Sequence, residues 1–452
     1  MKFCRKGAKA QRLGRGEFIS ERIGARESHL HALLCVLCVS AANDLINTPV
    51  AFADDWQFGG HAKYQYNVTQ YARDDVQALY GDNPAHDQGL DLRFKAEKRD
   101  GPWDFSAHYE LLALHGDSLE TRRRLAAAGY PTVGTVRGLP DDRQRLFDLT
   151  GTITDQNRTA AVQRLDRLAV GYSTGSQTLR FGRQAVSWGN GLTFHPLDFV
   201  NPFSPLAIDK DYKTGDDMLF GQWLTGGQGD LQAIVLPRRD PATGNVESDQ
   251  SSYAAKSRTR HGEVELDLLA ARHYGENLIG AGVVKSLGGA VWRLDVGYTD
   301  LKEDSGAWSL ATNLDYSWTW GGMNVYGYLE YFHSGVGESS TAGYTAPNPA
   351  LSARIARGEL FTLARDYASL GLQIELTPLV NLIQNLILNL NDGSGIYQLR
   401  GVYDWRQDVQ LMAGLNLPFG ARGDEYGGIP VGAPDTYTAI GRSVYFRGAY
   451  YF

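Results

Sequence analysis

Four side chains with hydrolytic chemistry alternate along one stretch of the chain, at Asp104, Ser106, His108 and Glu110. In an extended strand such residues share one face, and Ser, His and a carboxylate are the groups of a serine hydrolase. Neighbours two apart on a strand lie ~6.6–7 Å apart, longer than the hydrogen bond through which a histidine activates a serine. We therefore interpret this face as a polar lining and expect no catalytic residue, with an outer-membrane hydrolase as a minor alternative.

Oxygen-bearing residues between Asp209 and Asp217 have a spacing similar to part of a calcium loop. An EF-hand loop needs a bidentate Glu at its twelfth position, and counting from Asp209 that position is Phe220. The chain also has no H-E-x-x-H motif, no Walker loop and no dinucleotide fingerprint. We therefore expect neither a metal site nor a cofactor.

The elements that carry these residues show a period of two. Apolar and polar residues alternate in 56–68, in 90–97 and in 103–111, with charged residues at every second position. Such charges would lack partners in a soluble sandwich, whereas in a membrane barrel they face the lumen. No run of eighteen apolar residues is present, which excludes an ordinary transmembrane helix. The pattern predicts an all-β fold, a single transmembrane antiparallel β-barrel.

Two kinds of connection separate the expected strands. Tight turns are indicated by Gly288-Gly289 and Gly321-Gly322. Longer polar segments occur at 72–88, 114–157, 189–216, 238–250, 334–362 and 418–435. Short periplasmic turns and long extracellular loops are typical of outer-membrane barrels. Seventeen strands are clear, and an even number requires one more, for which 251–260 is available. We predict 18 strands, with 16 as the alternative.

The N-terminal region has the features of a secretory signal. A basic stretch precedes the apolar run 31–42, which is too short to span a bilayer, and Ala51-Phe52-Ala53 is a small-residue cleavage pattern. We expect residues 1–53 to be a signal peptide cleaved after Ala53, or after Ala42, and 54–452 to form the barrel. A buried helix or an uncleaved anchor is the alternative. All three cysteines precede residue 54, so the mature chain has none.

The last strand is aromatic and ends with the chain. Val444, Phe446, Tyr450 and Phe452 occupy alternate positions. This strand resembles the signature that outer-membrane assembly machinery reads, so we expect these four residues to be an assembly signal.

A second resemblance lies in the middle of the chain. The segment 179–189, followed by Pro196-Leu-Asp198 and Asn201-Pro202, resembles a segment of Gram-negative outer-membrane porin and exporter families. The segment 377–394 is similar to that group as well. The resemblance implies a barrel in the bacterial outer membrane and does not specify a substrate.

The register of the strands places residues of both charge signs in the lumen. The expected pore-lining residues are Arg93, Lys95, Glu97, His108, Glu110, Arg167, Arg180, Arg293, Asp295, Glu330, Arg400 and Arg447. Opposed acids and bases orient dipolar solutes such as sugars. We therefore expect a porin-like channel for passive passage of small hydrophilic solutes. A polysaccharide exporter, or a barrel scaffold that binds surface polysaccharide, is the alternative.

One long loop is rich in proline and aromatic residues, whose apolar side chains need cover. We expect it to fold into the lumen as a constriction, with an external cap as the alternative; its candidate residues are Phe194, Pro196, Asp198, Phe199, Asp209 and Asp211. In another loop, 117–129 is typical of a short basic helix capped by Asp117. We expect it to touch lipopolysaccharide, with attraction of anionic solutes or sugars as the alternative.

The charge of the expected mature chain narrows its partners. Residues 54–452 carry 36 Lys and Arg against 47 Asp and Glu, which argues against nucleic-acid binding. The expected partners are outer-membrane lipids, lipopolysaccharide, the barrel assembly machinery and a small hydrophilic solute. The sequence leaves the oligomeric state open.

Overall fold

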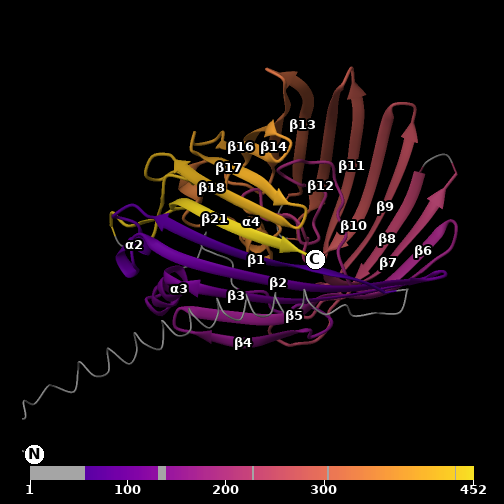
Figure 1. The fold of residues 1–452 in the computed structure, drawn as a ribbon, viewed down its shortest axis with the longest axis horizontal. Helices are drawn as coiled ribbons and strands as arrows, with labels where there is room; N and C mark the ends of the chain where they lie inside the picture. The colour runs from indigo at the N-terminus through magenta and orange to yellow at the C-terminus, as the bar shows by residue number, and fades with distance from the viewer. Residues whose placement is uncertain (1–55, 131–138, 227–228, 303–304, 433) are drawn as a thin grey trace, which may run out of the picture. The chain divides into compact units, whose positions relative to one another are not determined.

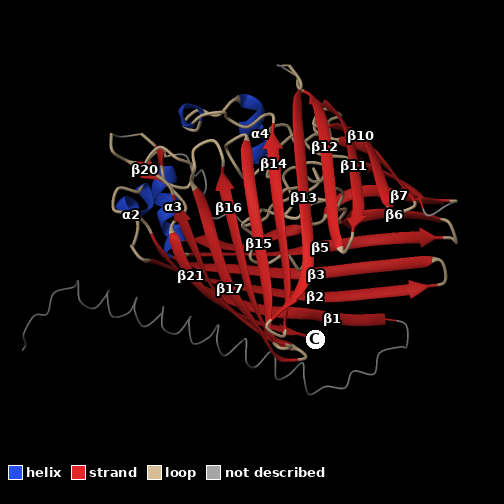
Figure 2. Cartoon of the chain, turned by 90° about the horizontal axis from the view of Figure 1, so that it is seen from above, coloured by secondary structure: helices blue, strands red, loops and turns tan. Residues whose placement is uncertain are grey.

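The computed structural model describes residues 56–130, 139–226, 229–302, 305–432 and 434–452. The expected signal peptide, with both of its cleavage sites, lies outside the described residues. In the described part, long antiparallel strands follow one another around a closed wall (Figures 1 and 2). Closure is achieved by the first and last strands, β1 and β21, which pair from His61↔Tyr451 to Gln70↔Arg442.

The wall contains 18 strands, which confirms the prediction and excludes 16. They are β1 (Trp56–Gln70), β2 (Ala85–Asp100), β3 (Trp103–Gly116), β5 (Thr159–Ser173), β6 (Gln177–Gln184), β7 (Asp216–Thr225), β8 (Gly229–Leu236), β9 (Ser252–His261), β10 (Val264–His273), β11 (Glu276–Leu287), β12 (Ala290–Asp300), β13 (Ala307–Trp320), β14 (Met323–Ser334), β15 (Asp366–Thr377), β16 (Val380–Asn389), β17 (Gly395–Arg406), β18 (Val409–Phe419) and β21 (Arg442–Tyr451). The strand inferred from parity is β9, which pairs with β8 and β10.

The two faces of the wall differ as the period of two predicts. Large apolar side chains on the outside are exposed, for example Phe58 at 54 % and Leu268 at 64 %, whereas inward charged residues such as Glu330 are buried. Because a hydrocarbon environment covers such an outer face, the wall has the surface of a membrane-spanning barrel. Exposed aromatic residues gather near the short-turn end: Trp56, Phe58, Trp103, Phe105, Tyr172, Tyr316, Trp318, Trp320, Trp405 and Phe452. They correspond to the aromatic girdle at a membrane interface.

The two ends of the barrel are unequal. At one end all eight connections contain two or three residues, and both termini of the described barrel lie there. The other end carries the long segments, but not uniformly. The connections 274–275 and 390–394 at this end are also short, because β10–β11 and β16–β17 form compact hairpins. A further correction concerns 114–157, where β4 (Thr150–Gln156) pairs with β5 and extends the wall.

The described parts of the long connections contain three helices, α2 (Val76–Tyr80), α3 (Asp117–Ala127) and α4 (Pro349–Arg357), with a 3-10 turn η1 (Thr341–Gly343). A small separate ladder joins β19 (Ile429–Pro430) to β20 (Tyr437–Thr438). The predicted helix at 117–129 is therefore present, but the prediction that Asp117 is its N-cap is wrong. Gly116 is the N-cap, and the Asp117 carboxylate accepts a hydrogen bond from the His86 N–H instead. None of the described helices has both the length and the apolar character needed to cross a membrane.

Candidate functional site

The connection between β6 and β7, residues 185–215, lies inside the barrel. We call it the inner loop. Its first attachment is to β14, where the Glu330 carboxylate accepts hydrogen bonds from the N–H groups of Leu192, Thr193 and Phe194 at 2.7–3.0 Å. The Asn313 amide also donates to Glu330 at 3.0 Å. Because three successive backbone donors converge on one carboxylate, this turn of the loop is fixed against the wall.

A neighbouring attachment uses β12. The Asp295 carboxylate accepts from the backbone and side-chain N–H groups of Asn190, at 2.5 and 2.8 Å. Thr193 adds a hydroxyl contact to Ser369 of β15 at 2.9 Å. The inner loop thus crosses from β6 to the wall formed by β12–β15.

The second half of the inner loop returns along the opposite side. Arg400 of β17 donates to the Ile208 carbonyl at 3.2 Å. Farther along, Lys63 of β1 contacts Asp209 at 2.8 Å and Asp211 at 2.5 Å, and Arg447 of β21 contacts Asp209 at 2.5 Å. We call residues 208–212 the acidic segment. Inward side chains from wall strands far apart in sequence therefore hold the loop.

Apolar packing covers the aromatic residues of the inner loop. Trp188, Leu197 and Phe199 are buried against the inner side of β7–β11, and the Trp188 indole donates to Gln232 at 2.7 Å. Phe194 stacks on Phe332 of β14 with ring centres 4.6 Å apart. Burying one such ring contributes about 1.5–3 kcal/mol, which explains why these side chains lie inside.

The remaining candidate residues of the loop have distinct places. Pro196 is half-buried, and Asp198 is buried against Lys213 at 2.6 Å. The Lys213 ammonium also donates to the Val186 carbonyl at 2.6 Å. The hydrogen bond to Val186 joins the two ends of the inner loop, and the ion pair with Asp198 ties its middle to its second end.

A ladder of alternating charges lines the inner face of β2, β3 and β5. Arg93 contacts Glu110 at 2.5 Å and Asp166 at 2.8 Å, and Arg164 contacts the same two carboxylates at 2.5 and 3.2 Å. A β-bulge opposite His108 and Tyr109 turns Asp166 inward together with Arg167. Each buried charge has an opposite partner, as a low-dielectric wall requires.

The predicted lining residues all belong to the inward set of their strands, but the structure does not assemble them into one site. Arg93, Glu110 and Arg167 join the ladder. His108 contacts Glu97 at 2.8 Å, and Arg293 contacts Asp315 at 3.2 Å. Glu330, Asp295, Arg400 and Arg447 instead hold the inner loop. Their role in solute passage stays a prediction.

Sequence reasoning missed Lys63, Tyr212, Arg164 and Asp166. Lys63 could have been predicted, because it lies in the polar phase of a strand with clear alternation. Arg164 and Asp166 are harder to find, since the bulge shifts the inward phase by one residue. Tyr212 lies in the loop, where no strand period applies.

The four side chains with hydrolytic chemistry do face inward together. However, Ser106 accepts a hydrogen bond from Arg180 at 2.8 Å, while Glu97 is the partner of His108 at 2.8 Å. Asp104 contacts Arg180 at 3.2 Å. Serine and histidine are therefore engaged with different residues, and the arrangement lacks the serine–histidine hydrogen bond of a hydrolase. Among the residues that the structure describes, no group of three or more His, Cys, Asp or Glu could hold a metal ion.

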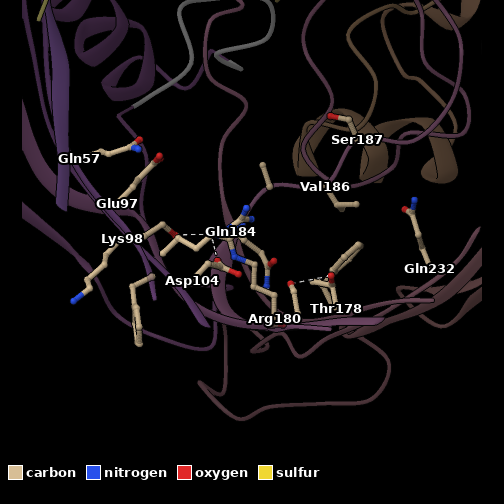
Figure 3. Close-up of a pocket in the computed structure, with 16 residues that line it drawn as sticks. Gln57, Glu97, Lys98, Asp104, Thr178, Arg180, Gln184, Val186, Ser187 and Gln232 are labelled. Carbon is tan, nitrogen blue, oxygen red and sulfur yellow. Dashed lines mark hydrogen bonds and ion pairs between the residues drawn. The ribbon is translucent and has the colours of Figure 1, made fainter. Parts of the chain in front are cut away.

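Two cavities lie beside the β1–β3 wall. The lower cavity, about 700 Å³ at the short-turn end, is lined by Gln57, Glu97, Ser106, Arg180 and Gln184 among others (Figure 3). The upper cavity, about 530 Å³, opens toward the long loops and is lined by Asp91, Leu114, Ser118, Lys63 and Arg447 among others. Polar and charged side chains contribute to both linings, and apolar surface predominates in the upper cavity. Such a lining admits water and hydrophilic solutes.

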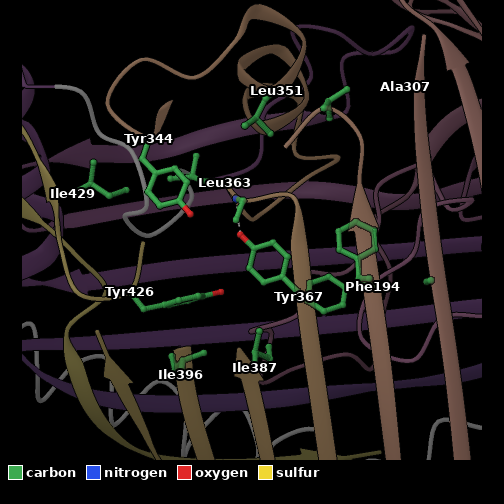
Figure 4. Close-up of a cluster of buried hydrophobic side chains, with 14 of the residues drawn as sticks. Phe194, Ala307, Tyr344, Leu351, Leu363, Tyr367, Ile387, Ile396, Tyr426 and Ile429 are labelled. Atoms are coloured by element: carbon green, nitrogen blue, oxygen red, sulfur yellow. Dashed lines mark hydrogen bonds between the residues drawn. The ribbon is translucent and has the colours of Figure 1, made fainter. Parts of the chain in front are cut away.

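The opposite side of the barrel is closed by long loops. Tyr344, Leu351 of α4, Tyr426 and Ile429 form a buried cluster with Phe194 and the inner wall (Figure 4). The Glu425 carboxylate at its centre accepts from the Leu363 N–H at 2.8 Å, the Tyr367 hydroxyl at 2.5 Å and the Asn389 amide at 2.9 Å. Desolvation raises the pKa of Glu425 to about 7 despite these donors.

The terminal strand closes the wall at the short-turn end. Val444, Phe446 and Phe452 are exposed on the outer face, with Tyr450 between the last two and partly exposed. The Gly60 N–H donates to the Phe452 carbonyl at 2.8 Å, and a Cβ at Gly60 would lie only 2.8 Å from the Phe452 ring. Glycine at this position therefore allows the last aromatic ring to cover β1.

Comparisons with known proteins support the fold. No family model matches the chain, and no curated protein matches it. The solved structure of OccAB3 from Acinetobacter baumannii is similar with a TM-score of 0.50 and 11% identity, over 88% of this chain and 100% of that one. OccK2 (OpdF) of Pseudomonas aeruginosa, solved in complex with glucuronate, has a TM-score of 0.50 and 9% identity, over 89% and 99%. Wzi of Escherichia coli, described as a carbohydrate-binding β-barrel, has a TM-score of 0.47 and 11% identity, over 87% and 84%.

Proposed function

We propose that this protein is a porin-like channel of the bacterial outer membrane, through which small hydrophilic solutes pass passively. The observation that carries the proposal is the pair of cavities with charged and polar lining residues, one toward each end of the closed barrel and both along the β1–β3 wall. An 18-strand wall without any filling would leave a wide aqueous channel. The inner loop fills part of that space and leaves these two cavities, so its role is that of a constriction.

The lining supports passage of dipolar, uncharged solutes. Most inward charges are already paired within the wall, as in the ladder of Arg93, Glu110 and Arg164. Paired charges of both signs generate local fields but little net preference for one ion. Hydroxyl and amide groups such as Ser106 and Gln184 supply hydrogen bonds at the lower cavity. Sugars and zwitterions suit such a lining.

The remaining parts of the proposal concern delivery and partners. Residues 1–53 act as a cleaved signal, and the aromatic terminal strand is the segment that the assembly machinery reads. The exposed apolar face contacts outer-membrane lipids, and the basic helix α3 contacts lipopolysaccharide. We expect the chain to act without catalysis, because Ser106 is hydrogen-bonded to Arg180 and has no hydrogen bond to His108, which contacts Glu97.

Solute uptake by liposomes tests this function. Vesicles that contain the purified protein and a trapped polymer should swell in isosmotic glucose, and more slowly in a trisaccharide, because the cavities limit solute size. Empty vesicles provide the control. Vesicles that do not swell in any small sugar would favour the alternative, a plugged scaffold or an exporter that depends on periplasmic partners.

A further inference from the structure

The acidic segment lies between the two cavities. Along β2, Asp91 lines the upper cavity and Glu97 the lower one, with Arg93 and Lys95 between them. The Tyr212 ring lies at this intermediate level, 4.4 Å from the Arg93 guanidinium carbon and 5.6 Å from the Lys95 ammonium. A solute that moves along the β1–β3 wall from one cavity to the other therefore meets the acidic segment.

Ion pairs hold the acidic segment in this position. Lys63 and Arg447, which contact Asp209 and Asp211, are only 4 % and 5 % exposed, whereas the two aspartates are 36 % and 41 % exposed. The Tyr451 hydroxyl also donates to Asp211 at 2.8 Å. The cations are thus built into the wall, while their counter-ions lie on the loop and are open to solvent.

This arrangement differs from that of the charge ladder. In the charge ladder, both members of each pair belong to wall strands, as in Arg93 with Glu110. Lys63 and Arg447 instead form their ion pairs with the inner loop. Because the two aspartates are open to solvent, a competing anion can replace them, provided that it keeps the buried cations paired.

The ends of the acidic segment are attached by other means. The Ile208 carbonyl accepts from Arg400 at 3.2 Å, and the Gly215 N–H donates to Asp166 at 3.2 Å. The Lys213 carbonyl accepts a further hydrogen bond from Arg167. These contacts do not involve Asp209 or Asp211, so the segment between them can leave the wall while the loop stays anchored.

We propose that the acidic segment is an internal counter-ion latch, which small anionic solutes release by replacing Asp209 and Asp211 at Lys63 and Arg447. The inference rests on the proposed channel function and adds a solute class and a means of control. In the closed state the loop carboxylates occupy the two cations, and Tyr212 obstructs the path. A solute anion that binds the same cations frees the segment and opens the path between the cavities.

The test compares wild type with Asp209→Asn/Asp211→Asn in planar bilayers, with inorganic phosphate as the anionic probe. The variant should show about a twofold or larger rise in single-channel conductance, because the segment no longer closes the path. Its reversal potential in a KCl gradient should shift toward anions, since Lys63 and Arg447 lose their counter-ions. Phosphate should raise the open probability of the wild type and leave that of the variant unchanged.

The matched control is Asp155→Asn/Asp249→Asn, which removes two exposed carboxylates at the long-loop end of the barrel, where they pair with Arg123 and Arg272. Its single-channel conductance, its reversal potential and its response to phosphate should match those of the wild type. If the wild type conducts and Asp209→Asn/Asp211→Asn matches this control, the latch is wrong and the channel stands. If neither conducts, the proposed function fails and the latch fails with it.

A measurement on the wild type alone covers the case in which the variant does not assemble. Salt screens half-exposed ion pairs, with a Debye length of about 10 Å at 0.1 M and about 3 Å at 1 M. Conductance divided by bulk conductivity should therefore rise between these two KCl concentrations. A ratio that stays constant or falls would overturn the latch.

Discussion

Carboxylates with several donors determine where the inner loop lies. Glu330 is fully buried and accepts from three successive backbone N–H groups, so its two oxygens are used for structure. Glu425 has the corresponding role in the outer loops, where it joins residues of three connections. Neither residue is distinguished in the sequence from the other acids, because the donors that define it come from distant segments.

Replacing Glu330 with Gln should loosen the inner loop. The amide nitrogen cannot accept a hydrogen bond, so at least one backbone N–H is left without a partner, at a cost of about 1–3 kcal/mol. The variant should unfold at lower temperature in detergent, and trypsin should cleave it faster at Lys210 or Lys213.

Glu375→Gln is the control for this change, since Glu375 faces the same lumen and has a single amide contact, from Asn324 at 3.0 Å. Equal trypsin sensitivity of the two variants would show that Glu330 does not anchor the loop.

Glu425 makes the outer-loop cluster sensitive to pH. Its pKa is about 7 in the folded protein and 4.5 by reference, so the folded state holds the proton more tightly. Its contribution to the free energy of unfolding is therefore largest below pH 4.5. This contribution is lost as the pH rises from 4.5 through 7, by about 1.4 kcal/mol per pH unit. Glu425→Gln should be more heat-stable than wild type at pH 8, and this advantage should disappear near pH 5.

The comparison between the two proteins cancels pH effects that both share. A difference in melting temperature that stays constant from pH 5 to pH 8 would contradict the account of Glu425.

At the scale of elements, the strands follow from the sequence more directly than the loops do. A period of two is enough to place β1, β2 and β3, because each has one face toward lipid. The parity argument located β9, in whose sequence apolar and polar residues alternate only weakly. The bulge in β5 and the hairpin that includes β4 escaped prediction, since an irregularity of one residue has no periodic signal.

The terminal strand offers a prediction about assembly. Phe452→Ala should lower the amount of folded barrel in the outer membrane, because the change removes both the last aromatic residue and the ring that covers Gly60. Folded protein is measured as the band that migrates differently before and after boiling. Trp320→Ala, which removes another exposed aromatic ring from the same end, should have a smaller effect. Equal loss in both variants would indicate that the terminus is not a special signal.

At the scale of the whole molecule, the barrel wall can be predicted from local sequence patterns, whereas the attachments of the inner loop cannot. Alternation and turn composition predict a closed barrel, and the requirement for an even strand number selects 18. Apolar side chains such as Phe194 and Phe199 indicate that the inner loop needs cover, but not where it attaches. Its attachments at Asp295, Glu330 and Lys63 depend on which wall strands face one another across the lumen, which no local pattern records.

Single-channel recording from purified wild-type protein in a planar bilayer tests the central claim most directly. The two cavities and the acidic segment between them predict discrete conductance steps with weak ion selectivity, and larger steps when residues 190–212 are replaced by a short glycine–serine linker. Expression and heat-modifiable migration confirm that both proteins are folded barrels. A folded wild-type barrel that gives no steps, together with a loop-deleted barrel that gives none either, would contradict the channel.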